Sequence, residues 1–465
     1  MKTKQIIFRF FCCLLIFNML FYAFTYCFPY NGLIMQNDNT WYSWILKTPL
    51  IFRNIGDTFN DFYNTLVVAL VKQPYSGLIA IPYTAINLLI MRIFNFTGNE
   101  TLALQESGLI GNGRILRDND FLNLSYVTFL LVTFIIIIYS LYKHLKRYQF
   151  SIRELILIFL AIILSFPFLY ALQRGNIIIF AFACIALYLI WYDSENKYKR
   201  EVALVLLSVA GVMKLYPFIF GIMLMKNKKV LSKEFIYPLV RIIIYSIIIF
   251  LIPYLFIPNG LANIPLFFNN IINYKVLQTS FININGVKER IWFNIGGGNI
   301  SVFNIAPLLF ALLNDGKIFD LPQTLLLVSN IFSIIVIIIY FIAIFLTKKK
   351  WETLLIATLL LMSIPSPNYL YSAIFMTFPL LSFLFSERNK KKYQYVLFFL
   401  IFVPLPLGML VSEKFYTTGF FPGISTASVV LIFSSLILGI ITSFRIIYEF
   451  IGNGEFYGKI NRIFK

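Results

Sequence analysis

Residues 121–142 read FLNLSYVTFLLVTFIIIIYSLY, an apolar run without a charged residue, and the basic stretch KHLKR follows at residues 143–147. A helix needs about 20 consecutive apolar residues to cross the hydrocarbon core of a bilayer. The run does not alternate between apolar and polar residues, as the strands of a membrane barrel do. Because only helices and closed barrels satisfy every backbone polar group in lipid, this run predicts a transmembrane helix.

The composition extends this prediction to the whole chain. Of the 465 residues, 59% are hydrophobic and only 13% are charged, and the mean hydropathy is +0.81. Soluble domains carry about 25% charged residues. Lipid must therefore solvate much of the surface, and we expect an all-α polytopic membrane protein that forms one integral membrane domain over residues 1–465.

Basic residues indicate which side of the membrane each link occupies. The formal net charge is +19, and most of the 39 Lys and Arg residues lie in short clusters between or beyond apolar runs. An excess of Lys and Arg marks cytoplasmic links, so both termini are expected in the cytoplasm. No soluble domain remains to carry a basic nucleic-acid-binding face, which argues against a nucleic-acid partner. The seven clusters span residues 2–9, 143–153, 197–200, 226–233, 348–350, 388–392 and 445–465.

These clusters order the apolar runs into about 12 transmembrane helices. The first run, Ile6–Phe28, predicts a retained first helix, and the next strong run begins at Phe121, so residues 29–120 form a large first outer loop. Within it, Leu78–Phe94 is weaker and is expected to be interfacial or re-entrant. Residues 258–320 form a second outer loop. Because the cytoplasmic links are all short, the working surface is expected on the outer face.

Two further apolar segments predict short helical hairpins. Val202–Met225 has cationic residues on both sides and is short for two full crossings, so we expect two shallow helices broken at Lys214–Pro217. One straight helix is the alternative, and it would place every later segment on the opposite side. Thr353–Phe385 repeats the pattern, with its break at Pro365–Asn368. A longer helix is expected from Glu154 to Leu172.

The first candidate site lies in the stretch GDTFNDFYN, residues 56–64, which Pro74 and Tyr75 follow. Asp57 and Asp61 are four residues apart and would share one face of a helix. A carboxylate among aromatic side chains at a membrane boundary suits a general base. The alternative is an ordinary helix start, with Asp57 as the N-cap and Asp61 in solvent.

Two cations form the second and third candidates. Arg174 lies in the turn QRGN, residues 173–176, and its planar guanidinium matches phosphate, although it could equally reach lipid headgroups. Lys214 begins KLYP, residues 214–217, inside an apolar segment, where a charge is costly and marks a functional site, a salt bridge to a buried carboxylate or an unusually deep water pocket. Arg241 is expected only to reach the headgroups.

The remaining reactive residues indicate no metal site. The four cysteines lie in or beside apolar runs without metal-ligand spacing, and His144 lies in a basic link. We therefore expect no metal and no cofactor.

The run QRGN, a helix, a basic link and then AGVMKLYPFIF together resemble the glycosyltransferase-C superfamily, and most of all its glycosyltransferase family 87. GDTFNDFYNTL with the later Pro74-Tyr75 resembles the first outer loop of that family, and IPSPNYLYSAIF resembles its Pro-Ser-x-x-Tyr segment. Ile81-Pro82-Tyr83 departs from the family's Tyr-Pro-Pro. The resemblance covers about residues 50 to 380.

The resemblance implies a GT-C-like fold and an inverting glycosyltransferase whose donor is a polyprenyl-phosphate-linked sugar. Its acceptor would be a lipid-linked or envelope glycan on the outer face. By the same resemblance Asp61 is the catalytic base with Asp57 in reserve, and Arg174 and Lys214 bind the donor phosphate. Supporting roles would fall to Asn176, Tyr216, Tyr75 and Asn368. The richness in Ile, Asn, Lys and Phe indicates an AT-rich bacterial genome, and hence the bacterial cytoplasmic membrane.

Two other functions stay open. A multi-span O-antigen or envelope polysaccharide polymerase or ligase would also place a large outer loop between helices, but would use diphosphate-linked donors. A transporter or flippase would ordinarily show inverted repeats of broken helices. The two hairpins only faintly resemble such a repeat.

Overall fold

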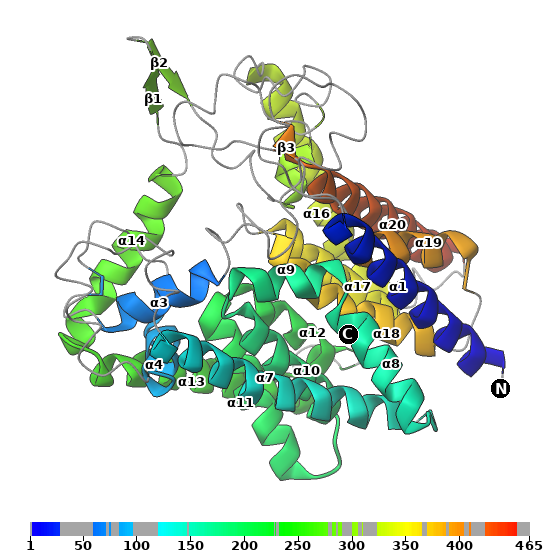
Figure 1. Cartoon of the computed structure of the whole chain (residues 1–465), viewed down its shortest axis with the longest axis horizontal. Coiled ribbons are helices and arrows are strands. Elements are labelled where there is room, and N and C mark those ends of the chain that lie inside the picture. Colours follow the sequence, from blue (N-terminus) through cyan, green and yellow to red (C-terminus); the bar gives the residue numbers. More distant parts are fainter. Residues whose placement is uncertain are drawn as a thin grey trace. The chain divides into compact units, whose positions relative to one another are not determined.

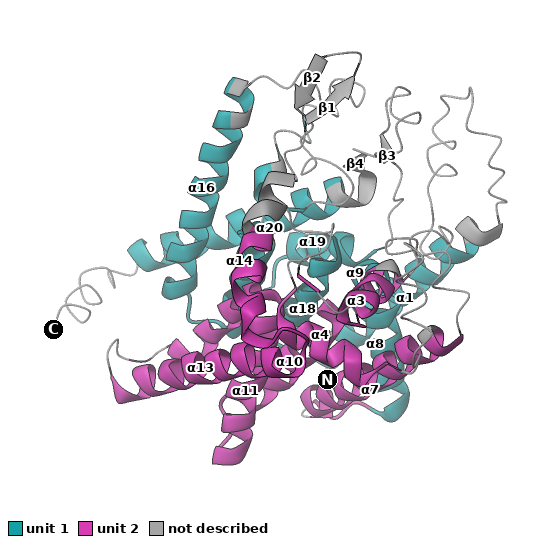
Figure 2. Ribbon diagram, turned by 90° about the vertical axis from the view of Figure 1, so that its left-hand side faces the viewer, with its two compact units in different colours: residues 1–53, 151–170, 279–465 teal, residues 54–150, 171–278 magenta. Residues whose placement is uncertain are grey.

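The computed structural model is predominantly helical, and Figure 1 shows its elements in chain order. It divides into two compact units, drawn in teal and magenta in Figure 2. Unit 1 comprises residues 1–53, 151–170 and 279–465, and unit 2 comprises residues 54–150 and 171–278. The structure describes residues 2–27, 59–70, 74–75, 83–95, 120–146, 148–226, 228, 232–277, 281–284, 287–290, 300–305, 309, 323–364, 370–386, 390–403, 409–410 and 424–452.

Unit 2 contains α-helices and short 3-10 helices. Its elements are α3 (Asn60–Leu70), α4 (Ala85–Ile93), α7 (Asp120–Lys146), α10 (Ile178–Trp191), α11 (Lys197–Lys214), η1 (Tyr216–Gly221), α12 (Ile222–Met225), α13 (Lys233–Leu251), η2 (Ile252–Phe256), η3 (Gly260–Ala262) and α14 (Asn263–Leu277). Helix α10 packs against α7 and α11, and α11 also packs against α13 (Figure 1).

Unit 1 contains further long helices and two small strand pairs. Its elements are α1 (Lys2–Cys27), α8 (Ile152–Ile163), η5 (Val302–Asn304), α16 (Gln323–Leu346), α17 (Lys350–Ser363), η6 (Leu370–Met376), α18 (Thr377–Phe385), α19 (Lys392–Phe402), α20 (Thr426–Gly452) and the antiparallel pairs β1 (Phe281–Ile284) with β2 (Val287–Arg290) and β3 (Met409–Leu410) with β4 (Ile424–Ser425). Helix α9 (Phe166–Arg174) runs from unit 1 into unit 2.

The expectation of a helical membrane protein is confirmed. Within the described part of the chain, five helices are long and apolar enough to cross a bilayer, and α8 with α9 makes a sixth candidate if the bent pair is one span. Helix α13 shows why lipid must solvate them, because only 6% of its apolar window is buried inside the protein. The five spans are Lys4–Ala23, Asn123–Lys146, Lys233–Phe256, Leu327–Leu346 and Val429–Gly452.

The expected helix from Glu154 to Leu172 is not continuous. Helices α8 and α9 meet at a bend of 61° after Ile163. Pro167 has no backbone N–H, and its ring clashes with the carbonyl four residues earlier, so a straight helix cannot pass through it. The side chain of Asn18 donates to the carbonyl of Leu164 at 3.1 Å and satisfies one backbone group that the bend releases.

The segment from Lys197 to Met225 folds back on itself, with its break inside the predicted stretch Lys214–Pro217, whereas the shallow membrane hairpin predicted for Val202–Met225 stays a prediction. The break lies at Leu215, where the backbone takes φ 57° and ψ −52°. The ring of Phe218 in η1 lies against Gly211 of α11, and the Tyr188 hydroxyl donates to the Phe220 carbonyl at 3.0 Å. The following chain therefore returns alongside α10 and α11.

A buried carboxylate joins α17 to α20 and to the link that precedes α17 in unit 1. Glu352, at the start of α17, is 2% exposed and accepts from Arg445 of α20 at 2.5 Å. Lys349 lies 3.1 Å from the same carboxylate, and the Thr347 hydroxyl donates to its other oxygen. A buried charge is costly unless it is paired and hydrogen-bonded, and this network meets both conditions.

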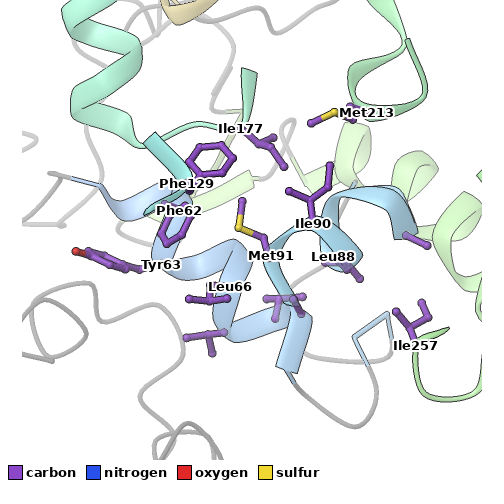
Figure 3. Packing of buried hydrophobic residues seen from close by; sticks show 14 of the residues in the cluster. Phe62, Tyr63, Leu66, Leu88, Ile90, Met91, Phe129, Ile177, Met213 and Ile257 are labelled. Atoms are coloured by element: carbon purple, nitrogen blue, oxygen red, sulfur yellow. The ribbon is translucent and has the colours of Figure 1, made fainter. Parts of the chain in front are cut away.

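A compact hydrophobic core holds α3 and α4 within unit 2. Phe62 and Leu66 of α3 pack with Leu88 and Met91 of α4 (Figure 3), and all four side chains are completely buried. Burying one such side chain away from water stabilises a fold by about 1.5–3 kcal/mol. Helix α4 has nine residues and a length of about 14 Å, too short to cross a bilayer. This core positions the helix that carries Asp61.

Candidate active site

Asp61 lies in the first turn of α3, at the point where this helix meets the end of α9. The backbone N–H of Phe59 donates to the carbonyl of Gln173 at 2.6 Å, and the Phe59 ring packs on Tyr126 with centroids 4.3 Å apart. The Tyr126 hydroxyl in turn donates to the Leu172 carbonyl at 2.8 Å. The start of α3 is thus attached to the QRGN turn through both backbone and side chains.

The QRGN turn is a helix C-cap of the Schellman type. Gly175 has φ +62°, its N–H donates to the Leu172 carbonyl at 2.9 Å, and the N–H of Asn176 donates to the Ala171 carbonyl at 3.4 Å. Glycine suits the left-handed position because it has no Cβ. Arg174 and Asn176 therefore lie on either side of a fixed turn, with their directions set by the backbone.

Arg174 and Asn176 hold the Asp61 carboxylate between them. Arg174 Nη2 donates to Asp61 Oδ1, and Asn176 Nδ2 donates to Asp61 Oδ2 at 2.7 Å. Asn176 Oδ1 accepts from the Ile178 N–H at 3.0 Å, which fixes the direction of the amide. The side chains of Asp61 and Arg174 are 15% and 23% exposed, so this ion pair is largely withdrawn from solvent.

Lys214 extends the site from a third element, the end of α11. The ammonium nitrogen lies 4.9 Å from the centroid of the Tyr83 ring, in a cation–π arrangement. The negative charge of Asp61 acts on it favourably. Asp61, Arg174 and Asn176 therefore make direct contact in unit 2. Lys214 lies within electrostatic reach of Asp61.

The other predicted residues divide into two groups. Tyr75 is buried, its hydroxyl donates to the Tyr83 carbonyl at 2.9 Å, and its own carbonyl accepts from Asn270 at 3.0 Å. Burial raises the pKa of Tyr75 well above its usual value, so the hydroxyl stays protonated and can donate. Tyr216 begins η1 directly after the break at Leu215. Asp57 and Asn368 lie outside the described residues.

The sequence did not single out several polar groups that the structure uses. Thr84 and Asn87 of the α4 segment bond to the end of α11. Arg241, expected only to reach lipid headgroups, pairs with Glu201 of α11, and the same carboxylate accepts from Tyr245 at 2.8 Å. The polar residues within Leu78–Phe94 were a usable signal, because they interrupt an apolar stretch.

Across the described ranges, no three His, Cys, Asp or Glu side chains gather closely enough to hold a metal ion.

Helix α3 and the residue before it approach Gly175 so closely that a side chain at position 175 would crowd them. A Cβ added there would lie 3.0 Å from Phe59 Cα and 3.0 Å from Phe62 Cβ. We expect Gly175→Ala to lower stability by at least about 1–2 kcal/mol, the cost of a left-handed backbone for an L-residue. The measurement is the melting temperature in detergent. Gly221→Ala is the control, because its Cβ would meet only Leu207 at 3.6 Å; equal effects would contradict the close approach.

Comparison with known proteins assigns the chain to a family. The sequence model described as Glycosyltransferase family 87 matches residues 121–367, more than half of the 465 residues. No curated protein and no solved structure matches the chain. The matched span contains Arg174, Asn176 and Lys214, whereas Asp61 precedes it. The chain therefore belongs to glycosyltransferase family 87 and is a membrane glycosyltransferase.

Proposed function

We propose that this glycosyltransferase transfers a sugar, with inversion, from a polyprenyl-phosphate-sugar donor to a hydroxyl of a lipid-linked or envelope glycan. The observation that carries the proposal is the Asp61 carboxylate held by Arg174 and Asn176, with the Lys214 ammonium within its electrostatic reach. One carboxylate and two cations are the groups that a base-assisted displacement of a phosphate requires.

The charges of the site fit a lipid monophosphate. Asp61, Arg174 and Lys214 together leave one positive charge, and the phosphodiester of the donor carries one negative charge. After transfer, the departing polyprenyl phosphate monoester carries two negative charges when fully ionised, and Asp61 has become neutral by accepting a proton. The total is then zero both before and after the reaction. In a site largely withdrawn from solvent, such a balance avoids an uncompensated charge at either stage.

The transfer is a single displacement. The acceptor oxygen forms a bond to the anomeric carbon on the face opposite the phosphate, and the bond between that carbon and the phosphate oxygen breaks. The electron pair of the broken bond stays on the phosphate, and the acceptor proton passes to the Asp61 carboxylate. The Arg174 guanidinium donates to Asp61, and its delocalised positive charge stabilises the negative charge that grows on the phosphate. One displacement inverts the anomeric centre.

The proposed setting is the outer face of the bacterial cytoplasmic membrane. The seven basic clusters support cytoplasmic termini and links, with about 12 crossings and with residues 29–120 and 258–320 outside. A donor anchored by a polyprenyl chain already lies in the membrane, so the chain has no need of a nucleotide-binding domain.

The donor class can be tested directly. Liposomes containing the purified protein and bacterial lipid extract as acceptor are supplied with radiolabelled mannose, glucose or arabinose on polyprenyl phosphate, on polyprenyl diphosphate, or on a nucleotide. We expect transfer from at least one monophosphate donor and none from the other two classes. Transfer from diphosphate donors alone would refute the monophosphate proposal and favour a polymerase or ligase.

A further inference from the structure

Helix α11 ends in an unusual backbone conformation directly after Lys214. Leu215 takes φ 57° and ψ −52°, a region that residues with a Cβ rarely adopt. Such a conformation persists only when its surroundings enforce it, and it is most often found at functional sites. Contacts from other elements must therefore hold Lys214 and Leu215 in this conformation.

The N-terminal end of α4 supplies two hydrogen bonds to this helix end. Thr84 Oγ1 donates to the Val212 carbonyl at 3.1 Å, and Asn87 Nδ2 donates to the Met213 carbonyl at 3.0 Å. The last carbonyls of a helix have no partner within it, so these bonds satisfy groups that would otherwise be buried alone. Thr84 and Asn87 are 3% and 0% exposed.

The Thr84 hydroxyl donates to α11 instead of capping its own helix. Thr84 occupies the N-cap position of α4, where a threonine hydroxyl normally accepts from a backbone N–H of the first turn. No such bond is formed, and the hydroxyl points to α11 instead. Tyr83, the residue before it, places its ring 4.9 Å from the Lys214 ammonium. Three contacts from one short segment, residues 83–87, thus converge on the last turn of α11.

We infer that Thr84 and Asn87 are positioning residues, which fix the last turn of α11 so that the Lys214 ammonium faces the donor phosphate. This inference rests on the proposed function, in which Lys214 binds that phosphate. A lysine is a point charge on a flexible four-carbon stem, so its location depends on how firmly its backbone is held. The hydrogen bonds at Val212 and Met213 hold the two residues directly before it.

The alternative is that the two bonds only stabilise the fold. The two roles differ in how their loss combines with the loss of Lys214. If Thr84 and Asn87 act through the ammonium, replacing them lowers kcat/KM no further once Lys214 has been replaced. If they act on the fold alone, the loss is the same in either background.

The test is a double-mutant cycle on the full-length protein in liposomes. Thr84→Val and Asn87→Leu, which keep volume and remove the donors, are combined in the wild type and in Lys214→Met. We expect kcat/KM for the polyprenyl-phosphate-sugar to fall by about tenfold or more in the wild type and by less than about twofold in Lys214→Met. Equal losses in both backgrounds would overturn the inference.

Further variants separate positioning from folding. Thr84→Ser keeps the hydroxyl and should retain activity within about twofold of the wild type, whereas Thr84→Val should lose more. This pair of single variants tests the positioning role if the double variant does not fold. Thr133→Val is the matched control, because the buried Thr133 hydroxyl donates only to the Phe129 carbonyl within α7. Equal activity of Thr84→Ser and Thr84→Val would contradict the positioning role.

The double-mutant cycle also distinguishes failure of the positioning role from failure of the phosphate-binding role proposed for Lys214. If Lys214→Met alone keeps wild-type kcat/KM for the donor, the phosphate-binding role of Lys214 fails, and the positioning role fails with it. If Lys214→Met is impaired while the Thr84 and Asn87 variants are not, only the positioning role fails.

Discussion

Asp61→Asn is expected to lower the rate of sugar transfer by about 10²- to 10⁴-fold, the usual contribution of a general base. The amide has nearly the shape of the carboxylate, and its oxygen can still accept from Arg174 or Asn176, so α3 should remain docked on α9. It cannot take the proton from the acceptor hydroxyl. The loss should therefore fall on kcat, with a smaller change in KM for the donor.

The measurement is initial-rate transfer in liposomes, together with the melting temperature of each variant. Asp120→Asn is the matched control, because Asp120 is an exposed carboxylate at the start of α7 and should be replaceable without loss. Wild-type transfer by Asp61→Asn would remove this residue from the chemistry.

Arg174→Met is expected to lower kcat/KM for the donor by about 10²- to 10³-fold, as the loss of one charge-stabilising donor does in other enzymes. Arg174 pairs with the Asp61 carboxylate and is proposed to bind the donor phosphate, so its removal leaves both anions with less compensation. Arg174→Lys keeps the charge but loses the planar fork of donors, and we expect an intermediate loss.

The kinetic constants for donor and acceptor are measured separately for these variants. Arg153→Met is the control, since Arg153 is an exposed cation on α8 within the basic cluster of residues 143–153. If Arg174→Met changed only the constants for the acceptor, the assignment of Arg174 to the donor phosphate would be refuted.

The composition of the site could be predicted from the sequence, but most of its contacts could not. Asp61, Arg174 and Lys214 are conspicuous because charged residues are rare in so apolar a chain. Their pairing was not visible in spacing, since Asp61 and Arg174 are 113 positions apart, and only the family resemblance placed them in one site. The Schellman turn at Gly175 then shows why a glycine and an asparagine follow the arginine.

The hydrogen bonds that fix the end of α11 before Lys214 could not be predicted from the sequence, for a different physical reason. Pro217 and the flanking charges predicted a break near Lys214, and the structure has it at Leu215. Thr84 and Asn87, however, bond to backbone carbonyls at positions 212 and 213, and every residue has a carbonyl. When a side chain bonds to a backbone carbonyl, its partner can be any residue, so the sequence does not identify the partner.

The long apolar helices could be predicted from the sequence more fully than their irregularities. The apolar runs and basic clusters predicted the long helices, because lipid imposes the same length and polarity on each of them. Pro167 was a visible signal for the bend after Ile163, although the apolar run itself continues through it. The pair Arg241 with Glu201 was missed because its partners are 40 positions apart.

The contact between α3 and the end of α9 also sets an order of events during synthesis. A ribosome adds about 5 to 20 residues per second, so Asp61 is made roughly 6 to 23 s before Arg174, which is 113 positions later. During that interval the Asp61 carboxylate lacks the side chains of Arg174 and Asn176 that donate to it in the finished protein. A chain that stops before α9 leaves the Asp61 carboxylate without these partners. The contact that assembles the candidate site thus also distinguishes a chain that includes α9 from one that stops before it.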